Sequence, residues 1–344
     1  MTGRAIIQHQ TGLRECALVL LCAGAIALLP LFVHKAYPLH VLNLAMIYVP
    51  LAIGANIITG YCGMVSMGQA AFFGIGAYTS ALLMMRLGAP WLVAFFGAGA
   101  LASLLGVVVA LPCLRVRSDF LSLMTIAFGQ IFLVVVNAWM DLTRGPMGLP
   151  GVPRIQLAGW VAHTEADIWY VTATVALLAA WGTARIAGGP IGRAWEMVRD
   201  DEIAAQALGV NLTRSKMLAF GVGCFLSGLA GSLFAHELRL VSPDAFIAEE
   251  SLLIMQMAIL GGLASIPGSI LGAVLMIGVP EALRSSVPAL IIYRPGIVGM
   301  LLLVMMIWCP QGILGRRRAA PPMLLAISDM LRRGIGLTPW ARQL

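Results

Sequence analysis

The chain has 344 residues, of which 60% are hydrophobic and only 11% are charged. A typical soluble domain carries about 25% charged residues. This composition excludes an ordinary cytosolic enzyme, a disordered protein and a secreted disulfide scaffold. The net charge of +7 does not indicate nucleic acid, because Lys and Arg mark the cytoplasmic side of membrane proteins. We therefore expect an all-α fold, a polytopic transmembrane helical bundle.

Stretches without Asp, Glu, Lys or Arg predict the membrane spans, because about 20 apolar residues cross the hydrocarbon core. The stretch 36–85 must hold two spans, with a broken helix near 60–69. The stretch 251–280 reads as two shorter helical pieces with a break near 261–268. We count nine or ten membrane segments. The charge-free stretches are 16–34, 36–85, 87–114, 120–140, 168–184, 217–236, 251–280 and 295–315.

The basic residues set the orientation of these spans. Placing both termini in the cytoplasm puts 15 of the 22 Lys and Arg inside, which agrees with the positive-inside rule. Residues 187–216 then form a cytoplasmic loop and residues 142–166 lie outside. Residues 1–315 form the transmembrane domain, and residues 316–344 form a basic cytoplasmic tail. That tail is either an interfacial helix on anionic lipid or a frayed segment.

The chain lacks the motifs of several chemistries. No Gly-x-x-x-x-Gly-Lys-Ser/Thr segment is present to bind a nucleotide. His236-Glu237 begins like a zinc-binding helix, but Leu240 stands where the second His is needed. The six cysteines lie in or near apolar stretches and predict neither a disulfide framework nor a zinc site. We expect no metal, no bound cofactor and no catalytic residue, so a partner must supply the energy for any uphill transport.

The loop 187–216 carries the most distinctive pattern of charges. Its middle favours a helix, with acidic residues at the centre, arginines at the flanks and alanines that leave a face of short side chains. Gly209 is expected to end this helix with a positive φ, and Ala205 to lie against a partner. The segment is either a solvated surface helix or a docking helix for a cytoplasmic protein. Its candidate residues are Arg193, Arg199, Asp200, Asp201, Glu202, Ala204, Ala205 and Gly209.

Ala204-Ala205-x-x-x-Gly209 resembles the cytoplasmic-loop motif of ABC importer permeases, usually Glu-Ala-Ala-x-x-x-Gly, although Ile203 stands at the Glu position. Further blocks are Gly192-Arg-Ala-Trp195, Gly63-Met-Val-Ser66-Met-Gly68-Gln69, Val241-Ser-Pro243 and Trp308-Cys-Pro310-Gln-Gly312. Together, across roughly residues 40–315, the chain resembles the bacterial branched-chain amino-acid ABC permease family. The M-type (LivM-like) subunit is the closest fit.

The resemblance implies a set of partners and a location. It implies a transmembrane permease domain over 1–315 that moves branched-chain or related neutral amino acids across the bacterial inner membrane. The partners would be a homologous second permease subunit, a periplasmic substrate-binding protein and two cytoplasmic ATPase subunits that use ATP and Mg. The loop 187–216 would be the ATPase coupling loop. Urea or short amides are alternative substrates, and a passive channel or a membrane-embedded enzyme are alternative classes.

Polar residues inside the spans are candidates for a translocation path. Each is costly in hydrocarbon and should face protein or water, so hydrogen bonding between helices is the alternative role for every one. The Gly-rich segment 60–78 reads either as close helix packing or as a broken helix beside the path. The candidates are Asn56, Ser66, Gln69, Gln130 and Gln256.

Overall fold

A computed structural model describes residues 36–113, 118–157, 160–286 and 312–315, together with Gly296 and Gly299. The span expected within 16–34, most of the stretch 295–315 and the basic tail 316–344 lie outside the described residues.

Within the described ranges, six helices are long and apolar enough to cross a membrane. The first continues α2 into a π-helix, η1 (Ile57–Tyr61). The spanning helices are α2 (Ala36–Asn56), α3 (Gln69–Leu87), α4 (Trp91–Cys113), α5 (Ser118–Ala138), α7 (Glu165–Ala187) and α10 (Leu212–Leu238). The prediction of a helical membrane bundle is confirmed.

The predicted count of nine or ten segments is not confirmed. Helix α11 (Ala248–Gly261) has 14 residues, which is about 21 Å at 1.5 Å per residue, less than the roughly 30 Å of a hydrocarbon core. It meets α12 (Ile266–Ser286) at a bend, so the two pieces form one interrupted pair. The helices are interrupted at both expected places, because residues 62–68 and 262–265 are not helical.

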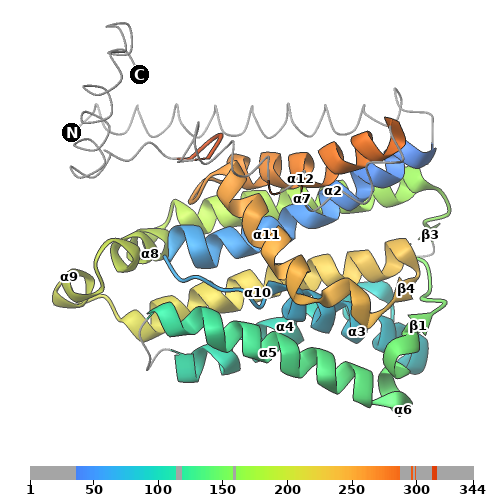
Figure 1. Ribbon diagram of the computed structural model, residues 1–344, viewed down its shortest axis with the longest axis horizontal. Coiled ribbons are helices and arrows are strands. Elements are labelled where there is room, and N and C mark those ends of the chain that lie inside the picture. Colours follow the sequence, from blue (N-terminus) through green and yellow to red (C-terminus); the bar gives the residue numbers. More distant parts are fainter. Residues whose placement is uncertain are drawn as a thin grey trace, which may run out of the picture.

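Short helices and strands lie at the two ends of the bundle and distinguish one end from the other (Figure 1). Helices α8 (Pro190–Asp200) and α9 (Glu202–Ala207) lie at one end. The opposite end holds β1 (Leu149–Pro150), paired antiparallel with β4 (Leu240–Val241). Near them lie α6 (Met140–Thr143), η2 (Gly145–Met147), η3 (Pro243–Phe246) and the pair β2 (Gln156–Leu157) with β3 (Trp160–Val161).

Helix α10 forms the core of the bundle and packs against α2, α3 and α4. The backbones of α3 and α10 approach closely, since a Cβ added at Gly76 would lie 2.2 Å from the carbonyl oxygen of Gly228. Gly76 therefore belongs to tight packing between α3 and α10, one of the two interpretations of the Gly-rich segment 60–78. Helix α5 differs, because only 17% of its apolar window is buried. Its exposed apolar side is suited to lipid or to another membrane subunit.

Candidate functional site

Hydroxyl groups from two neighbouring helices hold the first helix break, residues 62–68. The backbone N–H of Met67 donates to Thr125 Oγ1 on α5 at 3.0 Å. The N–H of Ala70, in the first turn of α3, donates to Ser251 Oγ on α11 at 3.0 Å. Non-helical backbone at membrane depth needs such partners, because hydrocarbon supplies none. The break is therefore a built feature between α5 and α11.

Two predicted path residues, Ser66 and Gln69, lie buried at this break. Gln69 Oε1 accepts a hydrogen bond from Ser227 Oγ on α10 at 2.8 Å. Gln69 Nε2 and Ser66 Oγ are buried and bond to no protein group in the described part of the chain. The break thus carries polar atoms with unused hydrogen-bonding capacity, which packing alone does not require.

Asn56 ties the first break to the second. It is buried at the end of α2, and its Nδ2 donates to the carbonyl of Ser265 at 3.0 Å and to Ser269 Oγ at 2.6 Å. Its Oδ1 accepts from the N–H of Ala264 at 2.9 Å, a residue held at φ +58°. The carbonyl of Gly262 accepts from the same amide at 3.3 Å. Asn56 is therefore engaged on both sides of its amide, as a clamp between the breaks.

The remaining two path candidates lie on the helices that flank the first break. Gln130 is exposed on α5, and Gln256 is half-buried on α11. Thr125 on α5 and Ser251 on α11 are the residues that bond to the break. Gln130 follows Thr125 along α5, and Gln256 follows Ser251 along α11. The structure thus groups Asn56, Ser66 and Gln69 at the breaks and leaves the two glutamines beside them.

The loop 187–216 contains two helices where the sequence indicated one. Asp201 interrupts them with extended backbone, φ −160° and ψ 116°. Its Oδ1 accepts from the N–H groups of Ile203 and Ala204, at 2.8 and 3.0 Å, and so caps the start of α9. Gly209 follows the end of α9 with φ +84°, which confirms the expected stop with a positive φ.

The expectation that Ala205 faces a partner is wrong for this chain. Its side chain is 1% exposed, because α9 packs against α8 and α10 and turns its alanine inward. The exposed apolar groups of this region are Ile203 and Leu208, at 81% and 74% exposure. Ala205 therefore docks on the chain itself, whereas Ala204, Ile203 and Leu208 are exposed and free to meet another protein.

Arg199 links this loop to the first break. Its Nη1 donates to the carbonyl oxygen of Gly60, in the π-helix, at 2.5 Å. Gly63 lies against the same side chain with φ +76°, and a Cβ there would come within 2.7 Å of Arg199 Cγ. Glycine at this position permits both the left-handed backbone and the close approach. Helix α8 thus touches the interrupted helix directly.

Most of the other charged candidates in the loop 187–216 also bond to groups of this chain. Glu202 Oε1 pairs with Lys216 Nζ at 2.7 Å, and Asp201 serves as the helix cap. The indole of Trp195 is fully buried and donates to the carbonyl of Ser215 at 2.9 Å. Asp200 Oδ1 lies 3.6 Å from Arg199 Nε, although its side chain is 61% exposed, and Arg193 and Ala204 are also exposed.

Residues 37–309 match the protein family described as branched-chain amino acid transport system / permease component. The chain belongs to this permease family. It is 33% identical over 299 residues to the high-affinity branched-chain amino acid transport system permease protein LivM of Salmonella typhimurium, covering 80% of this chain and 69% of that protein. This confirms the resemblance drawn from the motifs and describes a membrane transport subunit rather than an enzyme.

Two other relatives show the same relationship. The LivM protein of Escherichia coli K12 is 32% identical, with 80% of this chain and 69% of the relative covered. The permease protein LivH of the same organism is 30% identical over 294 residues, with 80% and 93% covered. No solved structure matches the chain significantly.

Replacing Asn56 with alanine should destabilise the permease and reduce uptake. The change leaves the N–H of Ala264 without the amide oxygen that pairs with it, and an unmet buried group costs about 1–3 kcal/mol. The carbonyl of Ser265 keeps its bonds from the N–H and hydroxyl of Ser269. The matched control is Asn137→Ala, because the Asn137 amide donates to the carbonyl of Leu133 in its own helix, at 2.9 Å. Size-exclusion profiles after heating measure the difference, and equal melting of the two variants would show that Asn56 is no clamp.

Proposed function

We propose that the chain is the transmembrane permease subunit of a bacterial ABC importer that moves branched-chain or related neutral amino acids into the cytoplasm. Two relatives that share about a third of its residues are named as high-affinity branched-chain amino acid permease proteins. The observation that carries the proposal is the contact of Arg199 with Gly60. It joins an exposed helix pair, suited to a partner, to a break inside the membrane domain.

The proposed complex contains a homologous second permease subunit, two cytoplasmic ATPase subunits that use ATP and Mg, and a periplasmic substrate-binding protein. The end of the bundle with α8 and α9 faces the cytoplasm, as do both termini and the tail 316–344, while residues 142–166 face the periplasm. The excess of Lys and Arg on the inner loops supports this orientation in the inner membrane. The exposed apolar side of α5 is suited to the second permease subunit.

Ile203 and Leu208 form the proposed docking surface for an ATPase subunit. They are exposed apolar side chains, Ile203 in the first turn of α9 and Leu208 directly after its last residue, and an apolar side chain seated in a protein pocket supplies most of the energy of such contacts. Asp200 and Arg193 provide charges at the rim, which set partner choice more than affinity. A displacement of α8 by the ATPase acts on Gly60 through the Arg199 side chain and so reaches the break.

The first break supplies the proposed path. Ser66 Oγ and Gln69 Nε2 are neutral polar atoms with capacity left to bind, and Gln130 and Gln256 flank them on α5 and α11. Neutral groups replace part of the water around an amino acid without holding it too tightly for release. Asn56 is left out of the path, because its amide is fully used in the clamp.

Two alternatives differ in substrate or in mechanism. A permease of the same family for urea or short amides would keep every partner but carry another cargo. A passive channel or facilitator would need no ATPase, and the exposed docking residues of α9 would then have no role.

Purified permease reconstituted in liposomes with its partner subunits should take up leucine, isoleucine or valine only with ATP on the side of α8 and α9. A non-hydrolysable ATP analogue should abolish uptake, because the energy for the proposed transport comes from ATP hydrolysis in the partner ATPase subunits. Competition by leucine against urea and acetamide identifies the cargo. Equal uptake with and without ATP would overturn the importer and leave the channel.

Ile203→Asp and Leu208→Asp should release the ATPase while the permease still inserts in the membrane. Burying a charge in place of an apolar contact at an interface centre should lower co-purification by about tenfold or more. Met147→Asp is the matched control, since Met147 is 86% exposed at the opposite end. Arg199→Ala should instead keep the ATPase bound and lose uptake. If Ile203→Asp, Leu208→Asp and Arg199→Ala all bind the ATPase and transport as the parent does, the loop is a solvated connection.

Gln69→Leu should reduce uptake without loss of assembly, because it removes the free Nε2 from the break. Ser227→Ala serves as control, since it removes the hydrogen bond that Gln69 Oε1 accepts and the hydroxyl's bond to the carbonyl of Gly223 in its own helix, but keeps Gln69 Nε2. Initial uptake rates of both variants, normalised to assembled complex, separate a path role from a packing role. Equal losses would assign Gln69 to packing against α10.

A further inference from the structure

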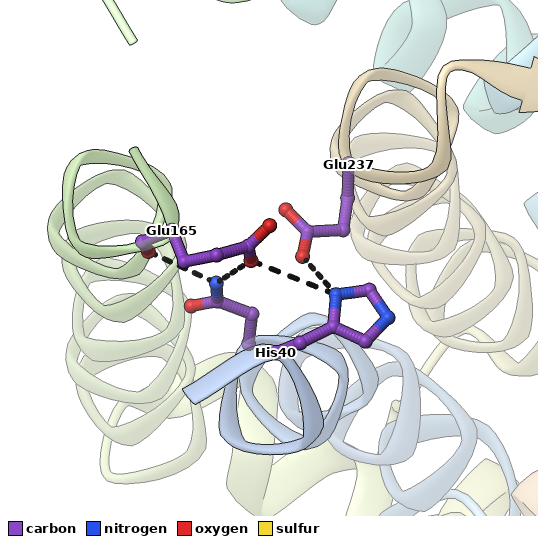
Figure 2. A network of polar contacts seen from close by, with 4 residues as sticks. His40, Glu165 and Glu237 are labelled. Atoms are coloured by element: carbon purple, nitrogen blue, oxygen red, sulfur yellow. Dashed lines mark hydrogen bonds and ion pairs between the residues drawn. The ribbon is translucent and has the colours of Figure 1, made fainter. Parts of the chain in front are cut away.

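Three metal-ligating side chains from three helices meet at the end of the bundle remote from α8 and α9 (Figure 2). His40 lies in the first turns of α2, Glu165 begins α7, and Glu237 is near the end of α10. One ligand atom from each lies within 4.8 Å of the others. More than a hundred residues separate Glu165 from His40 and more than seventy separate it from Glu237, so no sequence motif announces the cluster.

The separations between these atoms fit the coordination sphere of a single small cation. Nitrogen and oxygen ligands bind Zn²⁺ at about 2.0–2.2 Å, so two ligands of a tetrahedral ion are about 3.4 Å apart. His40 Nδ1 lies 2.9 Å from Glu237 Oε1 and 3.6 Å from Glu165 Oε2. These values lie on either side of the tetrahedral separation. Small side-chain rotations that shift the ligand atoms by a few tenths of an ångström would therefore allow the three residues to bind an ion.

Glu237 gives a second, independent indication of a ligand. The residue is 8% exposed and its side chain 0%, and it points toward His40 and Glu165 (Figure 2). Its Oε2 is buried without a hydrogen-bond partner among the residues that the structure describes. A buried carboxylate beside a second carboxylate is costly unless a positive charge compensates it. A divalent cation would satisfy the free oxygen and both carboxylates at once.

The surroundings orient the ligands and leave the site open on one side. Asn43 Nδ2 donates to Glu165 Oε2 at 3.1 Å and to the Glu165 carbonyl at 3.0 Å, the kind of outer contact that fixes a metal-binding carboxylate. The side chains of His40 and Glu165 are 33% and 38% exposed. An ion therefore has a way in from solvent, and Glu237 forms the buried floor of the site.

We propose that His40, Glu165 and Glu237 bind one divalent transition-metal cation of the Zn²⁺ class. One imidazole and two carboxylates suit such ions, whereas Mg²⁺ and Ca²⁺ prefer oxygen ligands alone. The sequence predicted no metal, because these three ligands lie far apart along the chain and form no local motif. His236, which drew attention there, bonds instead to Ser80 and to the carbonyl of Pro153. If α8 and α9 are cytoplasmic as proposed, the site faces the periplasm and clamps α2, α7 and α10.

Metal titration of the purified full-length permease, freed of any affinity tag and of bound metal, tests the site. Co²⁺ is the probe, since its visible absorption reports coordination, and Zn²⁺ is the competitor. We expect one Co²⁺ per chain, displaced by Zn²⁺, and a higher melting temperature with Zn²⁺. His40→Gln and Glu237→Gln should each weaken binding by about tenfold or more and remove the stabilisation by Zn²⁺.

The controls are His163→Gln and Glu249→Gln, exposed residues of the same two types outside the cluster, and both should bind as the parent does. Glu165→Gln replaces Glu237→Gln if the latter does not fold. Binding without a fixed stoichiometry, or equal affinity in ligand and control variants, would mean an adventitious ion only. No binding at all would mean that the three side chains form a hydrogen-bonded network that shares protons. Either result overturns the proposal. Neither result bears on ATP-dependent uptake, which is measured separately.

Discussion

The structure depends on satisfying backbone polar groups where helices stop inside the membrane domain. Hydrocarbon offers no hydrogen bonds, so each interruption must find its partners within the protein. The first break takes them from Thr125 and Ser251. The second takes them from the amide of Asn56, and the N–H groups of Ile313 and Leu314 donate to the carbonyls of Leu260 and Gly261. Because Asn56 ends the helix that leads into the first break, the two interruptions share one clamp.

This shared clamp connects the loop 187–216, the proposed coupling loop, to both breaks. Arg199 holds the carbonyl of Gly60, and the π-helix joins Gly60 to Asn56 within one turn. Asn56 then bonds to the segment 262–265. A push on α8 therefore has a short route, through hydrogen bonds and one turn of backbone, to every irregular segment described in the membrane domain. That route is the physical basis for placing energy coupling in this loop.

The sequence predicted well whatever depends on local pattern. Charge-free stretches located the spanning helices, and glycines located both breaks and the stop at Gly209. Orientation around a helix axis was harder, because the alanines of 204–207 fit an outward face as well as an inward one, and the structure turns Ala205 inward. The count of nine or ten segments is not confirmed, since six spans lie within the described residues. The length of α11 is set by its bend at Gly262, where φ is +119°, and this depends on packing against the rest of the chain.

Contacts between distant residues were beyond the sequence. The roles of Thr125, Ser227 and Ser251 rest on hydroxyls that point at a break from three other helices, and nothing around them marks that use. The cluster of His40, Glu165 and Glu237 is the extreme case, since helix packing alone brings its members together. A signal existed in part, because Glu237 is a carboxylate at the end of a long apolar helix, where burial of a charge calls for a partner.

The packing also determines which parts are able to move. Helices α3 and α10 touch at backbone distance through Gly76 and Gly228, and α2 meets α10 in the same way at Gly54 and Gly223. Sliding either pair would drive backbone atoms together, so we infer that these helices move as one body. Helix α5 has mostly exposed side chains and is bonded to the first break through Thr125, and α11 is short and bent. If the proposed path opens at Ser66 and Gln69, the rearrangement therefore falls on α5 and α11, which flank this break.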